Sequence, residues 1–273
     1  MSFYGMNKLF VLIFSGILTV SISACSGFQF LTASYKSTDS FINSENNKNV
    51  KYKGDNKEYA NQVGLMLPKL IDTVEDKLGI KFTKMPIIYI CDTWQCMEDF
   101  TGANYQPRAS ANKRGVFISP KLIGKVKVTK NVLTHEITHV LSVENIHSLF
   151  QSIPPAWFDE GLATFVSNGG GAEKVTDGQA IESINQGKHF IPNSDGKKFS
   201  RMYGDKWGLE PHMFYRQSMM LVKHIHNKNP EKFKIFVRQV FSGNYKFSEV
   251  FYKHYNATVL EVWGDYKNEL QKT

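Results

Sequence analysis

The sequence predicts an α+β fold in which a small mixed sheet is followed by a mainly helical lobe. Apolar runs typical of strands occur only before residue 120, whereas apolar residues at helical spacing dominate from residue 131 onward. Of the 273 residues, 42% are hydrophobic and 21% are charged, which is the composition of a globular protein. We therefore expect one main domain, with a helix at 131–143 between the sheet and the helical lobe.

Spacing and end signals define the elements of the N-terminal half. Apolar residues recur at helical spacing over 57–78, and Gly79 is the kind of residue that ends a helix. The apolar run 85–91 lies beside polar turn residues and is predicted to be a strand. A short helix is expected over 94–100 and a second strand over 114–119.

The C-terminal half is predicted to be mostly helical. Apolar residues fall on one helical face over 131–143. Pro155 favours a helix over 155–167, because proline fits the first helical turn, and a run of glycines ends it. The segment 172–210 has no clear period and could be a lid or ordinary packing. Three more helices are expected, at 212–227, 230–241 and 257–271.

Residues 1–24 are expected to be a secretory signal peptide outside the fold. Lys8 supplies a positive charge, an apolar run covers 9–20, and small residues follow it. The run is too short for a stable membrane-spanning helix. The small residues that end in Cys25 resemble the bacterial lipobox. This resemblance implies acylation of Cys25 and lipid anchoring in the bacterial cell envelope, with the outer membrane favoured by Ser26. An ordinary signal peptide followed by a chance cysteine is the alternative.

Residues 25–56 are rich in Ser, Asn and Lys, which is typical of a flexible tether, and the folded domain is expected over 57–273. Cys91 and Cys96 are five positions apart. In an oxidising compartment they are expected to form a disulfide, although two buried thiols also fit the pattern. The net charge of +8 comes from scattered lysines without the basic and aromatic arrays of nucleic-acid binders, so nucleic acid is not an expected partner.

The main chemical signal is the motif HEITH at 135–139. His135 and His139 lie one helical turn apart on the same face of the predicted helix, so both can ligate one metal ion. Glu136 projects beside that ion and is placed to act as general base, taking a proton from water at the metal. This spacing on a helix is typical of metallopeptidases.

A third protein ligand is expected, because hydrolytic zinc sites usually have three protein ligands and one open position. The next predicted helix carries WFDEGLA at 157–163, and its Glu160 can face the histidine pair if the two helices are antiparallel neighbours. His135, His139 and Glu160 are therefore the expected ligands of one Zn²⁺ ion. Asp159 could orient a ligand histidine or be an ordinary acid near a helix N-terminus.

Together the two motifs resemble those of gluzincin zinc metallopeptidases, the M1-like or peptidase MA-like superfamily. The resemblance implies a zincin-type helical lobe and a peptide or protein substrate. Twenty residues separate His139 from Glu160, slightly more than is usual in M1 enzymes, and the surplus fits in the turn between the two helices. The sequence lacks the Gly-x-Met-Glu-Asn stretch with which M1 aminopeptidases hold a free N-terminus, so an endopeptidase is expected.

The same resemblance implies roles for two further segments. Tyr215 would stabilise the oxyanion of the tetrahedral intermediate, with Tyr203 or a purely structural tyrosine as the alternatives. Gly115, Val116 and Phe117 resemble the edge strand that binds substrate by main-chain hydrogen bonds, although an ordinary internal strand also fits.

Three hypotheses about function follow. The first is a zinc endopeptidase anchored to the envelope through its lipid, which the intact Glu136 favours. The second is a non-catalytic zinc-binding lipoprotein that acts as a binding or assembly module. The third is a zinc hydrolase for a non-peptide amide, such as a cell-wall crosslink. The oligomeric state stays open.

Overall fold

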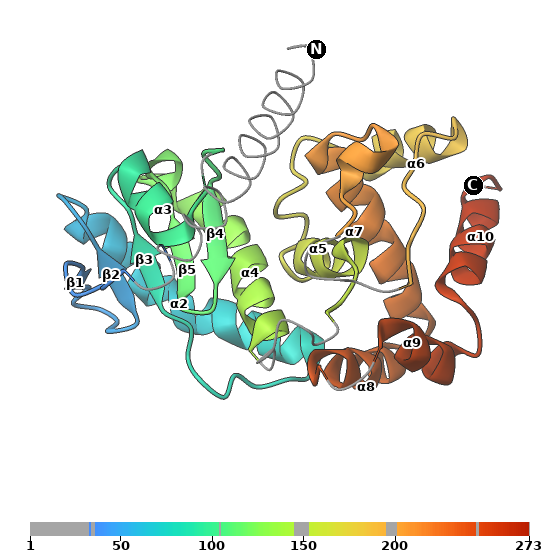
Figure 1. Cartoon of the computed structure of the whole chain (residues 1–273), viewed down its shortest axis with the longest axis horizontal. Helices are drawn as coiled ribbons and strands as arrows, with labels where there is room; N and C mark the ends of the chain where they lie inside the picture. Colours follow the sequence, from blue (N-terminus) through green and yellow to red (C-terminus); the bar gives the residue numbers. More distant parts are fainter. Residues whose placement is uncertain are drawn as a thin grey trace, which may run out of the picture.

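The computed structural model describes residue 33 and residues 36–103, 105–144, 153–194, 201–243 and 246–272. These residues form a sheet lobe and a helical lobe that lie side by side (Figure 1). The expected α+β class is confirmed. The signal peptide and Cys25 lie outside the described residues. Within the described ranges, none of the helices combines the length and the hydropathy needed to cross a membrane.

The sheet has five strands in the order β1-β2-β3-β5-β4. Strands β2, β3 and β5 are parallel neighbours, whereas β1 and β4 pair antiparallel at the two ends, so the sheet is mixed as expected. The bounds are β1 Ile42–Asn43, β2 Val50–Tyr52, β3 Ile88–Ile90, β4 Ala109–Asn112 and β5 Gly115–Ile118.

The structure corrects two expectations about this sheet. The tether expected over 25–56 is wrong from residue 42 onward, because β1 and β2 are part of the sheet. Strand β5 is internal, paired with β3 on one side and β4 on the other, so Gly115, Val116 and Phe117 are not an edge strand. The edge strand on this side is β4, whose residues Ala-Ser-Ala-Asn contain no apolar run that would have predicted a strand.

The helices agree well with the expected ranges. The zinc-motif helix begins five residues earlier than expected, at Val126. Helices α6 and α9 were not expected; α6 lies inside the unclear segment 172–210. The bounds are α2 Lys57–Leu78, α3 Trp94–Thr101, α4 Val126–Val143, α5 Ala156–Val166, α6 Asp177–Asn185, α7 Pro211–Lys228, α8 Pro230–Phe241, α9 Phe247–Tyr255 and α10 Val259–Leu270, with short 3-10 turns at η1 Pro120–Leu122 and η2 Gly204–Trp207.

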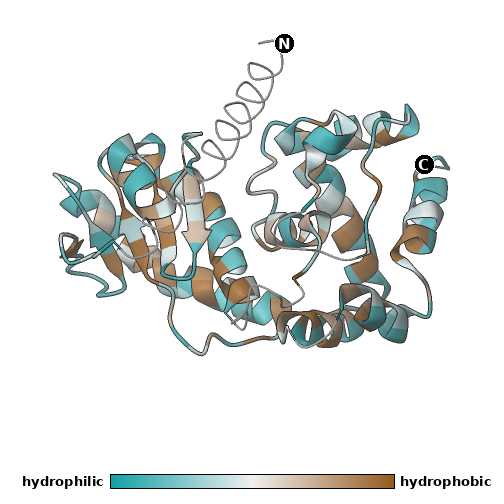
Figure 2. Ribbon diagram, viewed as in Figure 1, coloured by the Kyte–Doolittle hydropathy of each residue, from teal (hydrophilic) through white to brown (hydrophobic). Residues whose placement is uncertain are grey.

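Helices cover both faces of the sheet, which explains why β5 is buried throughout. Successive strand residues point to opposite faces. Thus Val116 and Ile118 belong to the main core beside α2 and α4, whereas Phe117 belongs to a smaller core beside α3. Figure 2 shows hydrophobic residues along the inner sides of these elements. The smaller core also contains the disulfide Cys91–Cys96, which joins the end of β3 to α3.

The end of α2 is fixed by a buried carboxylate. Gly79 adopts the left-handed conformation after the last helical residue, as its place in the sequence predicts. The Glu75 carboxylate accepts hydrogen bonds from the backbone N–H of Phe82 at 2.9 Å and from Lys81 Nζ at 2.6 Å. Burial alone would raise the pKa of Glu75, but these two donors outweigh it and hold the pKa below its usual value.

Helices α5 and α7 pack closely at the centre of the helical lobe. Gly161 of α5 lies so near Ser218 of α7 that an added Cβ would stand 2.6 Å from the Ser218 carbonyl oxygen. The segment after α6 packs on this pair, because Phe190 is fully buried and stacks against Trp157 and Trp263. Phe190 thereby fixes the segment that follows α6 to the core of the helical lobe.

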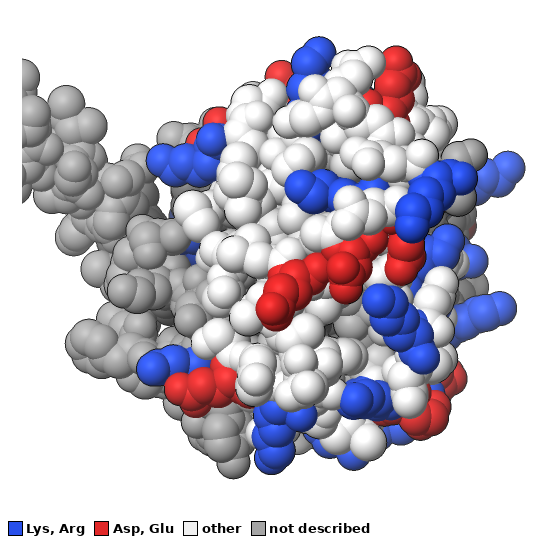
Figure 3. Space-filling view, turned by 90° about the vertical axis from the view of Figure 1, so that its right-hand side faces the viewer, with Lys and Arg blue, Asp and Glu red and all other residues white. Residues whose placement is uncertain are grey.

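Figure 3 shows the outer face of the helical lobe, where Asp and Glu side chains form a strip and Lys and Arg side chains are scattered around it. Helix α10 is near this face and carries three exposed acids at four-residue spacing, Glu261, Asp265 and Glu269. The positive net charge is thus unevenly distributed.

Candidate active site

Helix α4 brings the two expected histidine ligands together. The Nε2 atoms of His135 and His139 lie 3.0 Å apart, and the opposite ring nitrogens are held by other groups. His135 Nδ1 is 3.0 Å from the carbonyl oxygen of Gly170. His139 Nδ1 is 3.3 Å from the Asp159 carboxylate. Both imidazoles are therefore oriented with Nε2 toward one point, as ligand histidines are in metal sites.

Glu160 of α5 completes the group. Its Oε2 atom lies 3.3 Å from His135 Nε2 and 3.4 Å from His139 Nε2. This oxygen is buried and has no hydrogen-bond partner, which is costly unless a cation sits beside it. Ligands about 2.0 Å from a tetrahedral zinc lie about 3.3 Å from one another, close to the spacing of these three atoms. The three residues therefore fit one metal ion, and the structure brings together the ligand group that the sequence predicts.

Asp159, for which two roles stayed open, contacts a ligand histidine. Its carboxylate lies between His139 and Arg201, with Arg201 Nη2 donating to Oδ2 at 2.8 Å. Burial alone would raise the pKa of Asp159, but the charges of His139 and Arg201 hold the pKa well below its usual range. Arg201 also donates to the carbonyl oxygen of Pro154. Asp159 is therefore an ionised acceptor that fixes the His139 ring.

Glu136 faces the edge strand. The backbone N–H of Ala111 in β4 donates a hydrogen bond to its carboxylate. Burial raises the pKa of Glu136, and this effect outweighs the nearby histidines and the Ala111 bond. A carboxylate with a raised pKa beside the metal ligands is suited to move protons near neutral pH.

The free edge of β4 offers backbone groups next to Glu136. The Arg108 carbonyl accepts from Ser119 N–H at 3.0 Å, and hydrogen-bonded pairs alternate along an antiparallel ladder. Alternate residues of β4, counted from Arg108, therefore bond toward β5. Ala109 and Ala111 present their N–H and C=O groups at the free edge, which agrees with the bond from Ala111 to Glu136.

Tyr215 lies beside the metal-binding group. Its ring stacks on His135 with centroids 5.9 Å apart. The charge of Glu160, then burial and Glu136, raise the pKa of Tyr215 well above its usual value, so the phenol keeps its proton and can donate. Tyr203, the alternative, also lies near Glu160, but it is 37% exposed and its ring lies beside Arg201. Tyr215 therefore lies beside the metal-binding group with its phenol protonated, whereas Tyr203 lies closer to solvent.

Three parts of the site were not foreseen from the sequence. The glycines after α5, read only as a helix end, wrap around His135: a Cβ on Gly170 would meet the Asn131 carbonyl oxygen at 2.6 Å, and Gly171 has a φ of +87° with its Cβ position 3.1 Å from the His135 ring. Arg201 gave no signal, because it lies in the unclear segment. Tyr105 was also missed. Its side chain is 73% exposed, but partial desolvation of its phenol raises the pKa, and the charges of Glu136 and Glu160 raise the pKa further.

Comparisons with known proteins show similarity of fold only. No protein-family model matches the chain, and no curated protein matches its sequence. Among solved structures, native leukotriene A4 hydrolase from Saccharomyces cerevisiae matches with a TM-score of 0.50 and 15% identity over 83% of this chain and 38% of that chain. A further structure of the native yeast enzyme matches with a TM-score of 0.50 and 14% identity over 81% and 37%. The protein therefore spans less than two-fifths of these hydrolases and shares their fold at low identity.

Proposed function

We propose that this protein is a zinc-dependent endopeptidase that hydrolyses peptide bonds with Glu136 as its general base. The observation that carries the proposal is the unpartnered Oε2 of Glu160, which faces both histidine Nε2 atoms while Glu136 lies beside them. Two histidines, one carboxylate and an open position form a donor set suited to catalytic zinc. Zinc held there supplies Lewis acidity toward a carbonyl oxygen and toward water.

The side chains around the metal-binding group have separate roles in the proposed reaction. Glu136 accepts a proton from the attacking water and later gives it to the leaving amine, for which its raised pKa is suited. Tyr215 donates a hydrogen bond where the carbonyl oxygen becomes negative. Asp159 and the Gly170 carbonyl hold the two histidine rings in place.

Strand β4 supports a peptide substrate in extended conformation. Both backbone groups of Ala109 and the carbonyl of Ala111 face the free edge, where an added strand can pair, and the Ala111 N–H lies next to Glu136. A peptide on this edge would pass the general base. The match to the yeast leukotriene A4 hydrolase has 15% identity, so it supports a shared fold and not a shared leukotriene substrate.

Metal content and cleavage of a mixed peptide library test the proposal, comparing the full-length protein with Glu136→Gln. We expect about one zinc per chain in both proteins, with cleavage lowered by at least about a hundredfold in the variant. Zinc binding without cleavage by either protein would favour a zinc-binding module or an enzyme for a non-peptide amide. Absence of zinc in both would refute the site.

We also propose that the protein is anchored to the bacterial envelope through acylated Cys25. The lipobox resemblance at the end of the apolar run supports this, and Cys25 itself lies outside the described residues. Labelling with radioactive palmitate tests it. The wild type should incorporate label and sediment with membranes, whereas Cys25→Ala should do neither; equal labelling would refute the anchor.

A further inference from the structure

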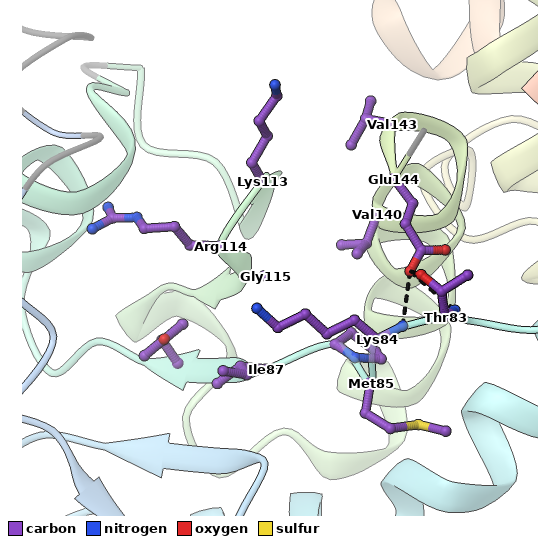
Figure 4. A pocket seen from close by; sticks show the side chains of 12 residues that line it. Thr83, Lys84, Met85, Ile87, Lys113, Arg114, Gly115, Val140, Val143 and Glu144 are labelled. Atoms are coloured by element: carbon purple, nitrogen blue, oxygen red, sulfur yellow. Dashed lines mark hydrogen bonds between the residues drawn. The ribbon is translucent and has the colours of Figure 1, made fainter. Parts of the chain in front are cut away.

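A pocket of about 460 Å³ lies at the end of the edge strand. One wall is formed by Val140 and Val143 of α4 and by Glu144 just after the helix, and the β4–β5 turn forms the opposite wall with Lys113. Lys84 and its neighbours in the segment that leads into β3 close the bottom (Figure 4). Most of the lining between the charged groups is apolar, which suits the stem of a side chain.

The pocket continues the candidate active site along α4. Glu136, Val140 and Val143 lie on one helical face, because residues four and seven positions apart share a face. At 1.5 Å per residue, Val140 is about 6 Å and Glu144 about 12 Å further along the axis than Glu136. Strand β4 ends at Asn112, one residue before Lys113 at the pocket rim. A peptide that follows the free edge of β4 past Glu136 therefore reaches this pocket.

The charged groups of the pocket leave two cations available. Arg114 points away, and its guanidinium donates to the carbonyl oxygens of Ala33, Lys36 and Phe100. The Glu144 carboxylate accepts three hydrogen bonds at Oε1, from the backbone N–H and the hydroxyl of Thr83 and from the backbone N–H of Lys84. The ammonium groups of Lys84 and Lys113 form no ion pair with any residue that the structure describes.

The run of β4 fixes which end of a peptide enters the pocket. Antiparallel pairing is the commoner arrangement, and a peptide antiparallel to β4 would extend its N-terminal side toward Asn112 and Lys113. An extended chain advances about 3.4 Å per residue, so the 6–12 Å span corresponds to about two to four residues. Building on the function proposed above, we propose that this pocket binds a Glu or Asp side chain located two to four residues N-terminal to the cleaved bond.

Matched peptides test this proposal on the zinc-loaded full-length protein. A peptide that the protein cleaves is remade with Glu, Gln or Lys at each of the three positions, and kcat/KM is measured. We expect about a tenfold preference for Glu over Gln at one position, decreasing with added salt. Lys84→Ala and Lys113→Ala should each reduce the preference, and the double change to Glu should reverse it in favour of Lys. Lys130→Ala, an exposed lysine elsewhere on α4, should leave it unchanged.

Equal cleavage of all peptides, a preference that survives both alanine variants, or a preference only on the C-terminal side of the bond would overturn the proposal. Anisotropy of fluorescein-labelled copies separates it from the endopeptidase proposal. If nothing is cleaved but Glu peptides bind more tightly than Gln peptides in a Lys84- and Lys113-dependent way, the pocket assignment stands and the peptidase proposal fails. Equal binding of the Glu and Gln peptides would refute the pocket.

Discussion

Replacing Gly161 by Ala tests the close contact between α5 and α7. The added methyl would stand 2.6 Å from the Ser218 carbonyl oxygen, whereas ordinary van der Waals contact begins at 3.4 Å. The two helices would have to separate by about 0.8 Å, and backbone atoms cannot turn aside as a flexible side chain can. Overpacking typically costs about 1–3 kcal/mol, and a contact this short against backbone atoms belongs at the upper end of that range. Alanine gains about 1 kcal/mol over glycine in a helix, so we expect a net loss of about 2 kcal/mol.

Urea and thermal unfolding of the metal-free protein measure this loss without a contribution from metal binding. The melting temperature should fall by about 4–8 °C. Gly264→Ala is the matched control, because it also lies inside a helix but its Cβ would meet nothing within 4 Å. The control should be more stable than the wild type by up to about 1 kcal/mol. A Gly161→Ala protein at least as stable as the wild type would refute the close-packing account.

Three further predictions concern the site and its support. Asp159→Asn should weaken zinc binding by about ten- to a hundredfold in a chelator competition assay, because Asp159 holds the His139 ring. Asp177→Asn changes an exposed acid on α6 and should leave zinc binding unchanged; equal loss in both variants would argue against a role of Asp159 in orienting His139. Folding lowers the pKa of Glu75, so its carboxylate stabilises the folded protein. This stabilisation is complete above the unfolded-state pKa of about 4.3 and is lost as pH falls through the lower folded-state pKa. Glu75→Gln should therefore lower the unfolding free energy by about 2 kcal/mol at pH 7, with a gap that narrows in acid; a constant gap from pH 7 to pH 2 would contradict this assignment. Replacing Cys91 and Cys96 by Ala should cost about 2 kcal/mol in urea unfolding, as expected for a short cross-linked loop, and an unchanged midpoint would show that the bond adds no stability.

Local signals predicted the helices and the metal ligands well. The period over 57–78 and the glycine after it define α2 to the residue, because both the apolar face and the end signal are local. His135 and His139 share a helical face whatever surrounds them. Glu160 could be inferred because a short connection makes neighbouring helices pack, and the structure places its carboxylate beside both imidazoles.

Strand pairing was harder to predict because partners are distant in the sequence. The residues of β2 are surrounded by polar sequence, and only pairing with β3 makes them a buried strand. The resemblance to gluzincins implied substrate contact at β5, but the burial of this strand on both faces reflects an internal position, which was the stated alternative. The edge belongs to β4, whose small and polar side chains carry no strand signal and whose free backbone groups are the functional feature.

The sequence by itself determined the metal-binding chemistry, since ligand identity and helical spacing are properties of neighbouring residues. Only the tertiary structure decided how that chemistry is supported. Arg201 reaches Asp159 across 42 positions and the Gly170 carbonyl reaches His135 across 35, contacts that depend on how separate segments pack. The pocket with Lys84 and Lys113 likewise exists only where the segment before β3, the β4–β5 turn and the end of α4 meet. Residue spacing does not predict such contacts between distant segments, because they depend on how the apolar faces of the whole chain are buried together.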